Sequence, residues 1–79
     1  RDYFRTKCQE LGYKAWGVWG NFVLVDFGSK ELLNKLVSDL EKRGIYIKYN
    51  YSGELSSCAS FTAGPEDIME RVIEVLADK

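Results

Sequence analysis

The sequence predicts an α+β fold, a two-layer α/β sandwich with helices on one face of a mixed three-stranded sheet. Two amphipathic segments each carry one apolar stripe at helical spacing. Between them lie a continuous apolar run and an alternating run, both typical of strands. The expected order is α-β-α-β-β-α, and a short extra strand can precede the first strong one. At 79 residues, 1–79 is expected to form a single domain.

The first helix is expected within residues 2–11, because their apolar positions recur at helical spacing. Gly12 can end this helix in a left-handed conformation. Residues 14–19 are compatible with a short strand or with an extended loop, since Gly17 and Gly20 interrupt the apolar pattern.

The clearest strand is Phe22–Phe27, which is β-branched, aromatic and apolar on both faces. Ser29 can cap the helix that follows, over Lys30–Arg43, by accepting a hydrogen bond from its first turn. Gly44 is expected to end that helix.

The segment Ile45–Tyr51 alternates and predicts a second strand, with Tyr46 and Lys48 on one face and Ile47 on the other. A third strand of small residues is expected over Cys58–Ala63. Gly64-Pro65 then opens the last helix, because proline suits the first helical position.

We expect Cys58–Ala63 to be the central strand, antiparallel to both of the others, with the two long helices on one face. The opposite face stays bare and presents one of two alternating sets. These are Phe22, Leu24 and Asp26, or Val23, Val25 and Phe27. A bare apolar face of this kind indicates a partner or another domain.

Composition excludes several classes of function. Eleven Lys+Arg against twelve Asp+Glu leave a net charge of −1, which gives no field for nucleic acid or an anionic membrane. The longest apolar stretch, Phe22–Val25, is far shorter than the roughly 20 residues of a transmembrane helix. The absence of histidine excludes a catalytic His and His-bearing metal sites. Cys8 and Cys58 are expected to be reduced and mostly buried, in a cytoplasmic protein.

The candidate motifs have structural interpretations that outweigh the chemical ones. Strand tyrosines such as Tyr46 could stack RNA bases, but they also pack in ordinary interfaces. Ser29-Lys30 fits a helix cap better than a Schiff-base dyad. Lys48 is either an edge residue in contact with solvent or an anion contact. We find no self-contained catalytic set. Because Arg1 stands where Met is expected, we also expect the chain to be a segment of a longer protein.

Four segments, taken in order, resemble the C-terminal small domain of fold-type I pyridoxal-phosphate aminotransferases, in particular the histidinol-phosphate aminotransferase branch. That domain carries patterns of the type G(F/Y)xV, ANFVLV, L(K/E)xRGI(L/I)VR and CLR(I/V)(S/T)xG. The matching segments here are residues 11–14, 20–25, 40–48 and 58–66. The resemblance covers nearly the whole chain.

The resemblance implies three substrate-binding residues. Asn21 matches an asparagine near the substrate side of the cleft. Lys48 matches a position that is usually arginine, where a cation faces the anionic end of the substrate. Ser60 stands where relatives carry the arginine that clamps a substrate carboxylate or phosphate, and a serine cannot replace that bidentate contact.

The resemblance also implies a function for the chain as part of a longer parent enzyme. The chain would close over the active site as a lid and contribute contacts to an amino-acid or amino-phosphate substrate. Pyridoxal 5'-phosphate and the catalytic residues would belong to the large domain of the same parent chain, itself expected to be a homodimer. The chain alone is expected to be inactive. The alternatives are a free-standing α/β module that binds a ligand or partner, and the small domain of a decarboxylase-like relative.

Overall fold

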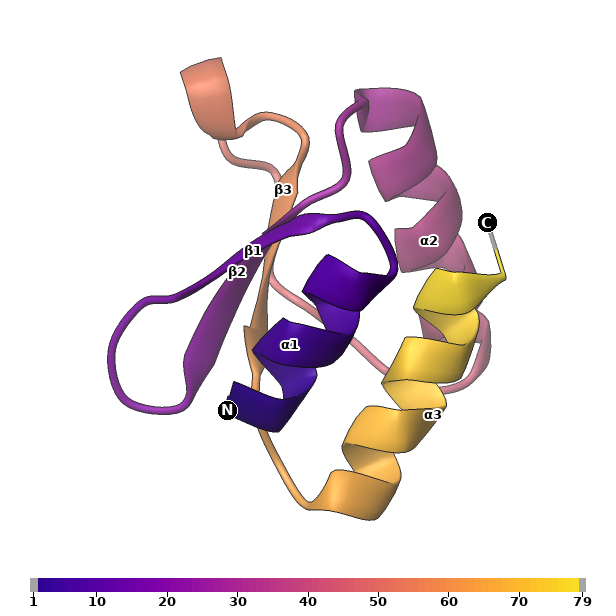
Figure 1. Ribbon diagram of the computed structural model, residues 1–79. Helices are drawn as coiled ribbons and strands as arrows, with labels where there is room; N and C mark the ends of the chain where they lie inside the picture. Colours follow the sequence, from indigo (N-terminus) through magenta and orange to yellow (C-terminus); the bar gives the residue numbers. More distant parts are fainter. Residues whose placement is uncertain (1, 79) are drawn as a thin grey trace.

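The computed structural model describes residues 2–78, which form three helices packed on a three-stranded sheet (Figure 1). The helices are α1 (Asp2–Glu10), α2 (Lys30–Lys42) and α3 (Glu66–Ala77), and a short 3-10 helix, η1, spans Gly53–Leu55. The strands are β1 (Lys14–Gly17), β2 (Phe22–Asp26) and β3 (Cys58–Thr62). The expected α+β class is confirmed.

The helix boundaries follow the local signals. Gly12 and Gly44 both adopt positive φ, 95° and 77°, beyond the ends of α1 and α2. The Ser29 side chain accepts a hydrogen bond from the Leu32 N–H at 3.1 Å, as a helix cap does. Pro65 was predicted to be the first residue of the last helix. In the structure it is the N-cap, and α3 begins one residue later, at Glu66.

The sheet order is β1-β2-β3, and both neighbouring pairs are antiparallel. The prediction of a mixed sheet was therefore wrong, and β2 rather than the 58–63 segment is central. The ambiguous segment after Gly12 forms an edge strand, β1, joined to β2 by a hairpin turn in which the Phe22 N–H donates to the Trp19 carbonyl.

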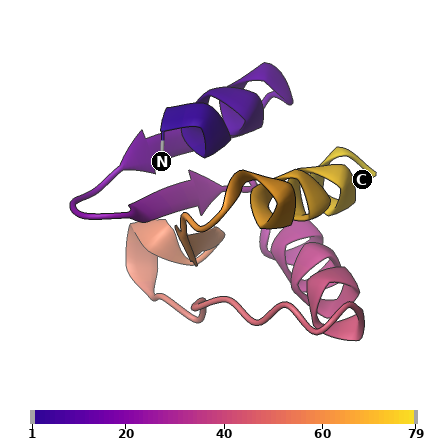
Figure 2. The same cartoon turned by 90° about the horizontal axis from the view of Figure 1, so that it is seen from below.

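The predicted strand Ile45–Tyr51 was wrong except at one residue. Lys48 forms an isolated antiparallel bridge with Ser60, so β3 does lie between β2 and this segment. Two residues beyond this bridge, Asn50 adopts a left-handed φ of 72°, which lies outside the strand region of backbone conformation. Figure 2 shows the segment running irregularly from α2 to η1.

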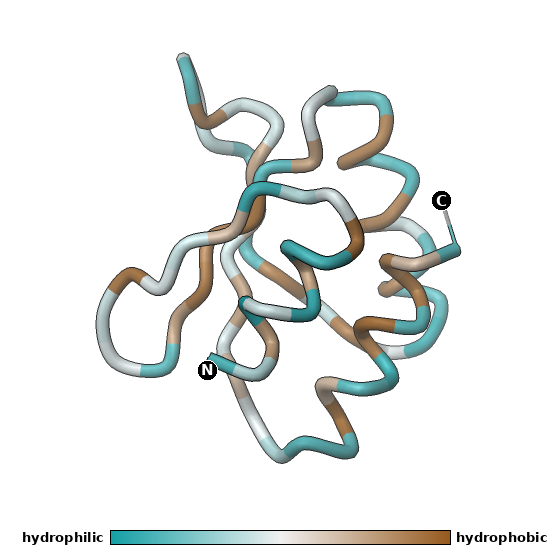
Figure 3. Tube along the Cα trace, viewed as in Figure 1, coloured by the Kyte–Doolittle hydropathy of each residue, from teal (hydrophilic) through white to brown (hydrophobic). Residues whose placement is uncertain are grey.

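The core lies between the sheet and the helices. Val23, Val25, Ala59 and Phe61 are fully or almost fully buried beneath side chains from all three helices. The Phe61 ring centroid lies 5.1 Å from that of Phe4 on α1. Along α2 and α3, hydrophobic positions recur once per turn, and β2 is hydrophobic over most of its length (Figure 3).

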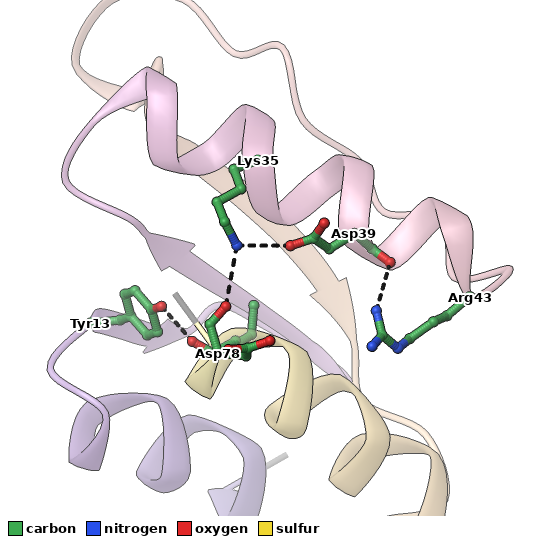
Figure 4. A network of polar contacts seen from close by, with 6 residues as sticks. Tyr13, Lys35, Asp39, Arg43 and Asp78 are labelled. Atoms are coloured by element: carbon green, nitrogen blue, oxygen red, sulfur yellow. Dashed lines mark hydrogen bonds and ion pairs between the residues drawn. The ribbon is translucent and has the colours of Figure 1, made fainter.

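A polar network fixes the end of α3 (Figure 4). The buried Tyr13 hydroxyl donates to the Leu76 carbonyl at 2.6 Å. Lys35 donates both to Asp39, at 2.9 Å, and to the Asp78 carbonyl, at 3.2 Å. These bonds satisfy carbonyls that a helix C-terminus leaves without partners, and they tie α2, α3 and the start of β1 together. Within residues 2–78, the helices are all too short or too polar to cross a bilayer.

Candidate functional site

The sheet has one face that the helices do not cover, which we call the open face. Alternate residues of a strand point to opposite faces. Since Val23 and Phe61 point into the core, Phe22, Leu24, Ser60 and Thr62 point the other way. Of the two sets that the sequence allowed, the bare face is therefore the one containing Phe22, Leu24 and Asp26.

Strand register places four residues in one row across the open face. Trp16 pairs with Leu24, Leu24 pairs with Ser60, and Ser60 bridges to Lys48. Directly paired residues project their side chains to the same side of a sheet. The row thus runs from an aromatic ring at one edge, through Leu24 and a hydroxyl, to a cation at the other edge.

Lys48 and Ser60 are held together by their backbones. The Ser60 N–H donates to the Lys48 carbonyl at 2.8 Å, and the Lys48 N–H donates to the Ser60 carbonyl at 3.4 Å. Ser60 is half-buried and Lys48 is exposed. Two of the three residues predicted from the resemblance are therefore neighbours on the open face.

Asn21 is separated from this pair. It is exposed at the end of the β1–β2 hairpin, where its carbonyl accepts a hydrogen bond from the Ala63 N–H at 2.6 Å. Ala63 follows Ser60 by three residues, a distance of about 10 Å along an extended chain. Asn21 therefore borders the same end of the sheet without joining the Lys48–Ser60 pair.

A hollow of about 430 Å³ adjoins the pair, between the segment after α2, the end of β3 and the start of α3. Lys48, Ser60, Thr62, Phe22 and Tyr46 contribute to it from the open face and the sheet edge. The remaining lining is Ile45, Ile47, Phe61, Gly64, Pro65, Ile68, Met69 and Val72. We refer to this feature as the hollow.

Sequence reasoning missed most of the hollow. The alternation of residues 45–51 did place Tyr46 and Lys48 together, and both are exposed while Ile45 and Ile47 are half-buried. No sequence pattern indicated that α3 lines the hollow. Its part of the lining depends on how Ile68 and Met69 pack near the end of β3.

Asp26 lies at the opposite end of the open face and has a structural role. Its carboxylate accepts hydrogen bonds from the Ser57 hydroxyl at 2.6 Å and the Gly28 N–H at 2.9 Å. The Ser57 bond, helped by Gly28 and the nearby charge of Lys14, holds the pKa of Asp26 below its usual value against the effect of burial. The carboxylate thereby anchors the turn after β2 to the loop before β3.

Both cysteines are free and buried, as the sequence predicted. Burial raises the pKa of the Cys8 thiol to about 12. Burial also raises the pKa of Cys58, with a further contribution from Asp26. Protonated, enclosed thiols are poor nucleophiles and poor metal ligands.

The described residues do not fit pyridoxal phosphate. An internal aldimine needs a lysine enclosed beside a cofactor pocket. Among residues 2–78, Lys7 is half-buried and paired with Glu10, and the remaining lysines are exposed. Over the same stretch, His, Cys, Asp and Glu side chains form no group of three or more that could hold a metal ion.

Comparisons with known proteins show similarity to aminotransferases. The chain is 32% identical over 78 residues to histidinol-phosphate aminotransferase from Rhodospirillum rubrum, covering 96% of this chain and 21% of that protein. It thus spans about a fifth of the length of the curated relative it matches. No protein-family model matches the chain.

Solved structures show the same architecture. Histidinol-phosphate aminotransferase from Sinorhizobium meliloti, crystallised with pyridoxal-5'-phosphate, superposes with a TM-score of 0.82 at 22% identity, over 98% of this chain and 22% of that one. A Burkholderia pseudomallei protein with a provisional aminotransferase assignment superposes with a TM-score of 0.81 at 26% identity. The match covers 99% of this chain and 23% of that one. The resemblance to a small domain of histidinol-phosphate aminotransferase and similar aminotransferases is confirmed.

Proposed function

We propose that residues 1–79 form one domain, the small C-terminal domain of a pyridoxal-phosphate-dependent aminotransferase similar to histidinol-phosphate aminotransferase. Two kinds of observation support this. The similar proteins are larger chains, of which this chain matches about a fifth. Within the chain, Lys48 and Ser60 are bridged on a sheet face left open by the helices of residues 2–78, and this pairing carries the proposal.

In this proposal the open face is turned toward the active-site cleft. Lys48 provides a positive charge for the anionic end of an amino-acid or amino-phosphate substrate. Its ammonium is a mobile point charge and lacks the fixed fork of an arginine, so it attracts the anion without orienting it in a plane. Ser60 adds a single hydroxyl beside it, and Asn21 borders the cleft at the hairpin end.

The cofactor would be bound by the large domain of the same parent chain, because the lysines described above do not fit it. Closure of the small domain over the cleft would exclude water and bring Lys48 to the substrate, as lids do in other enzymes. We further propose that the parent enzyme is a cytoplasmic homodimer of amino-acid metabolism.

The test is a pair of lysine variants in the full-length protein that contains this chain. Lys48→Gln removes the cation on the open face, and Lys30→Gln removes an exposed lysine at the start of α2 as a control. Loss of a charge-assisted contact should raise KM for a carboxylate- or phosphate-bearing amino donor about ten-fold or more, with a smaller change in kcat. Equal KM values for the two variants would contradict the proposed role of the open face.

The isolated chain offers a second check. Borohydride reduction in the presence of pyridoxal phosphate should trap no stoichiometric adduct on a single lysine, because none is enclosed within residues 2–78. Specific trapping on one lysine would place cofactor chemistry in this domain and overturn the division of roles.

A further inference from the structure

The β1–β2 hairpin concentrates exposed apolar side chains. Among residues 2–78, eight large hydrophobic side chains are exposed, and four of them lie within residues 16–22: Trp16, Val18, Trp19 and Phe22. Trp19 is 76% exposed and Val18 is 53% exposed. Trp16 and Trp19 are also the two tryptophans of the whole chain. We call residues 16–22 the aromatic hairpin.

The aromatic hairpin carries no charge. In a chain that is 29% charged, residues 15–25 contain no Asp, Glu, Lys or Arg. Charged side chains are a common means of keeping exposed strands soluble, and they are missing from this one. Enrichment in aromatic residues with depletion of charged ones is typical of the centre of a protein interface. Tryptophan is prominent among the residues that dominate binding energy. The composition therefore indicates a surface made for contact with protein.

Most of these side chains belong to the open face. Trp16 pairs with Leu24 there, and alternation along the chain places Val18 on the same side as Trp16. The Val18 N–H donates to the Phe22 carbonyl at 3.1 Å, which makes these two residues cross-strand neighbours. With about 200 Å² for an aromatic side chain, the three rings of the aromatic hairpin leave roughly 300 Å² exposed. A patch of this size on one small domain is often functional.

The aromatic hairpin is fixed before any partner arrives. The Phe22 N–H donates to the Trp19 carbonyl at 3.3 Å, and the Asn21 carbonyl accepts from the Ala63 N–H at 2.6 Å. A fixed turn loses little conformational entropy when a partner covers it. The Gln9 amide already donates to the Ala15 carbonyl of the edge strand β1, at 3.0 Å. Contact through side chains is therefore favoured over the addition of another strand.

The parent chain supplies a surface for this contact. The similar proteins are longer chains, of which this chain matches about a fifth. In the proposed function, the remaining part precedes residue 1. Figures 1 and 2 both place the start of α1 beside the end of β1, so the preceding chain enters next to the aromatic hairpin. A surface on the same polypeptide is present at high effective concentration, which favours it over separate partners.

We propose that the aromatic hairpin packs against the large domain of the parent chain and anchors the small domain to it. The occupant is an apolar, uncharged surface formed by the parent chain outside residues 1–79, because the hairpin offers no charge for a charged surface to pair with. Trp19, at the tip, is the main anchor, and Trp16 and Val18 cover its flank. Because it names the large domain as the occupant, the inference rests on the proposed function.

Hydroxyl-radical footprinting of the full-length protein tests whether the aromatic hairpin is covered. Within residues 2–78 alone, Trp19 is 76% exposed, whereas Leu55 is 40% exposed on η1, at the other end of the sheet (Figure 1). Docking reverses this order. After correction for intrinsic reactivity, Trp19 should be oxidised about three-fold less than Leu55, as expected for the desolvated centre of an interface.

Two matched variants of the full-length protein test whether Trp19 is the anchor. Both replace an exposed hydrophobic residue by serine, so neither removes a core contact of residues 2–78. Trp19→Ser should weaken the contact and raise the oxidation of Trp16 about two-fold or more, because Trp16 is 47% exposed without a partner. Leu55→Ser should leave Trp16 oxidation at the wild-type level.

Site-specific photo-cross-linking identifies the occupant. A benzoylphenylalanine in place of Trp19 keeps an aromatic group at the tip of the hairpin. Irradiation of the full-length protein should join position 19 to a residue outside 1–79 on the same chain, which leaves the mass of the chain unchanged on a denaturing gel. Mass spectrometry of the digest locates that residue. The same group in place of Leu55 should not give this product.

Several results would overturn the inference. Trp19 could be oxidised faster than Leu55, or Trp16 oxidation could be the same in both variants. Position 19 could cross-link to a second copy, which doubles the mass, only to added phosphatidylcholine vesicles, or to nothing. Failure of the proposed function has a different signature. In that case position 19 still cross-links within the same chain, but the full-length protein shows no aminotransferase activity.

Discussion

The two faces of the sheet are built from alternate residues of the same strands, and they differ in what their side chains contact. On the covered face, Val23 and Phe61 are 0% and 2% exposed beneath the helices. On the open face, their strand neighbours Phe22 and Ser60 are exposed and half-buried. Side chains on the covered face therefore contribute most of the folding free energy. Those on the open face can change with little loss of stability.

The largest difference between the faces is expected for an introduced charge. Ala59→Arg would bury an unpaired guanidinium under the helices and should cost more than about 3 kcal/mol, enough to unfold a small domain. Ser60→Arg, one residue later, should cost about 1 kcal/mol or less because its side chain reaches solvent. Urea unfolding of both variants measures the difference. Similar losses would show that residue 60 lies under the helices after all.

Removal of an aromatic ring is expected to show the same contrast. Phe61→Ala deletes a ring packed against Phe4 and Phe27 and should cost about 3–5 kcal/mol. Phe22→Ala removes a ring that is 42% exposed and should cost at most about 1 kcal/mol. Thermal unfolding monitored by circular dichroism gives both values. A loss at Phe22 as large as that at Phe61 would mean that the open face is part of the core.

The smallest effect concerns pH. The Asp26 pKa is depressed in the folded state, mainly by the Ser57 hydroxyl, so the ionised carboxylate stabilises the fold above its ordinary pKa of 3.8. That contribution disappears as the pH falls through the folded-state pKa. Between about pH 6 and about pH 2.5, the wild type should lose about 1 kcal/mol more than Asp26→Asn.

Glu70→Gln is the control for this pH effect, because Glu70 is an exposed carboxylate on α3. Its acid sensitivity should match that of the wild type. If Asp26→Asn also loses stability like the wild type, the Ser57 and Gly28 bonds do not depend on the charge of residue 26.

Much of the covered face could be predicted from the sequence, because its signals are local. The apolar stripes of α2 and α3, the Ser29 cap and the Phe22–Asp26 run each identify their own element. The antiparallel pairing of β2 with β3 was also predicted. The register confirms that pairing, while the face on which Ser60 lies had to come from the structure.

The open face was harder to predict, because it depends on backbone geometry between elements. Alternation from Ile45 to Tyr51 favours a strand, yet only Lys48 forms a bridge with β3, and Asn50 adopts a left-handed conformation. Gly17 and Gly20 obscured β1, whose pairing with β2 adds Trp16 to the row. The hollow is lined by residue 22, residues 45–48 and residues within 60–72, which are distant in sequence, so no local pattern predicts it.

The proposed role of the open face is tested most directly by substrate affinity of Ser60→Arg in the full-length protein. A guanidinium beside Lys48 should add one charge-assisted bond and tighten binding of a carboxylate-bearing amino donor about ten- to a hundred-fold. Ser38→Arg, on the exposed side of α2, controls for added charge and should leave affinity unchanged. A folded Ser60→Arg variant whose affinity matches that of the wild type would contradict the account.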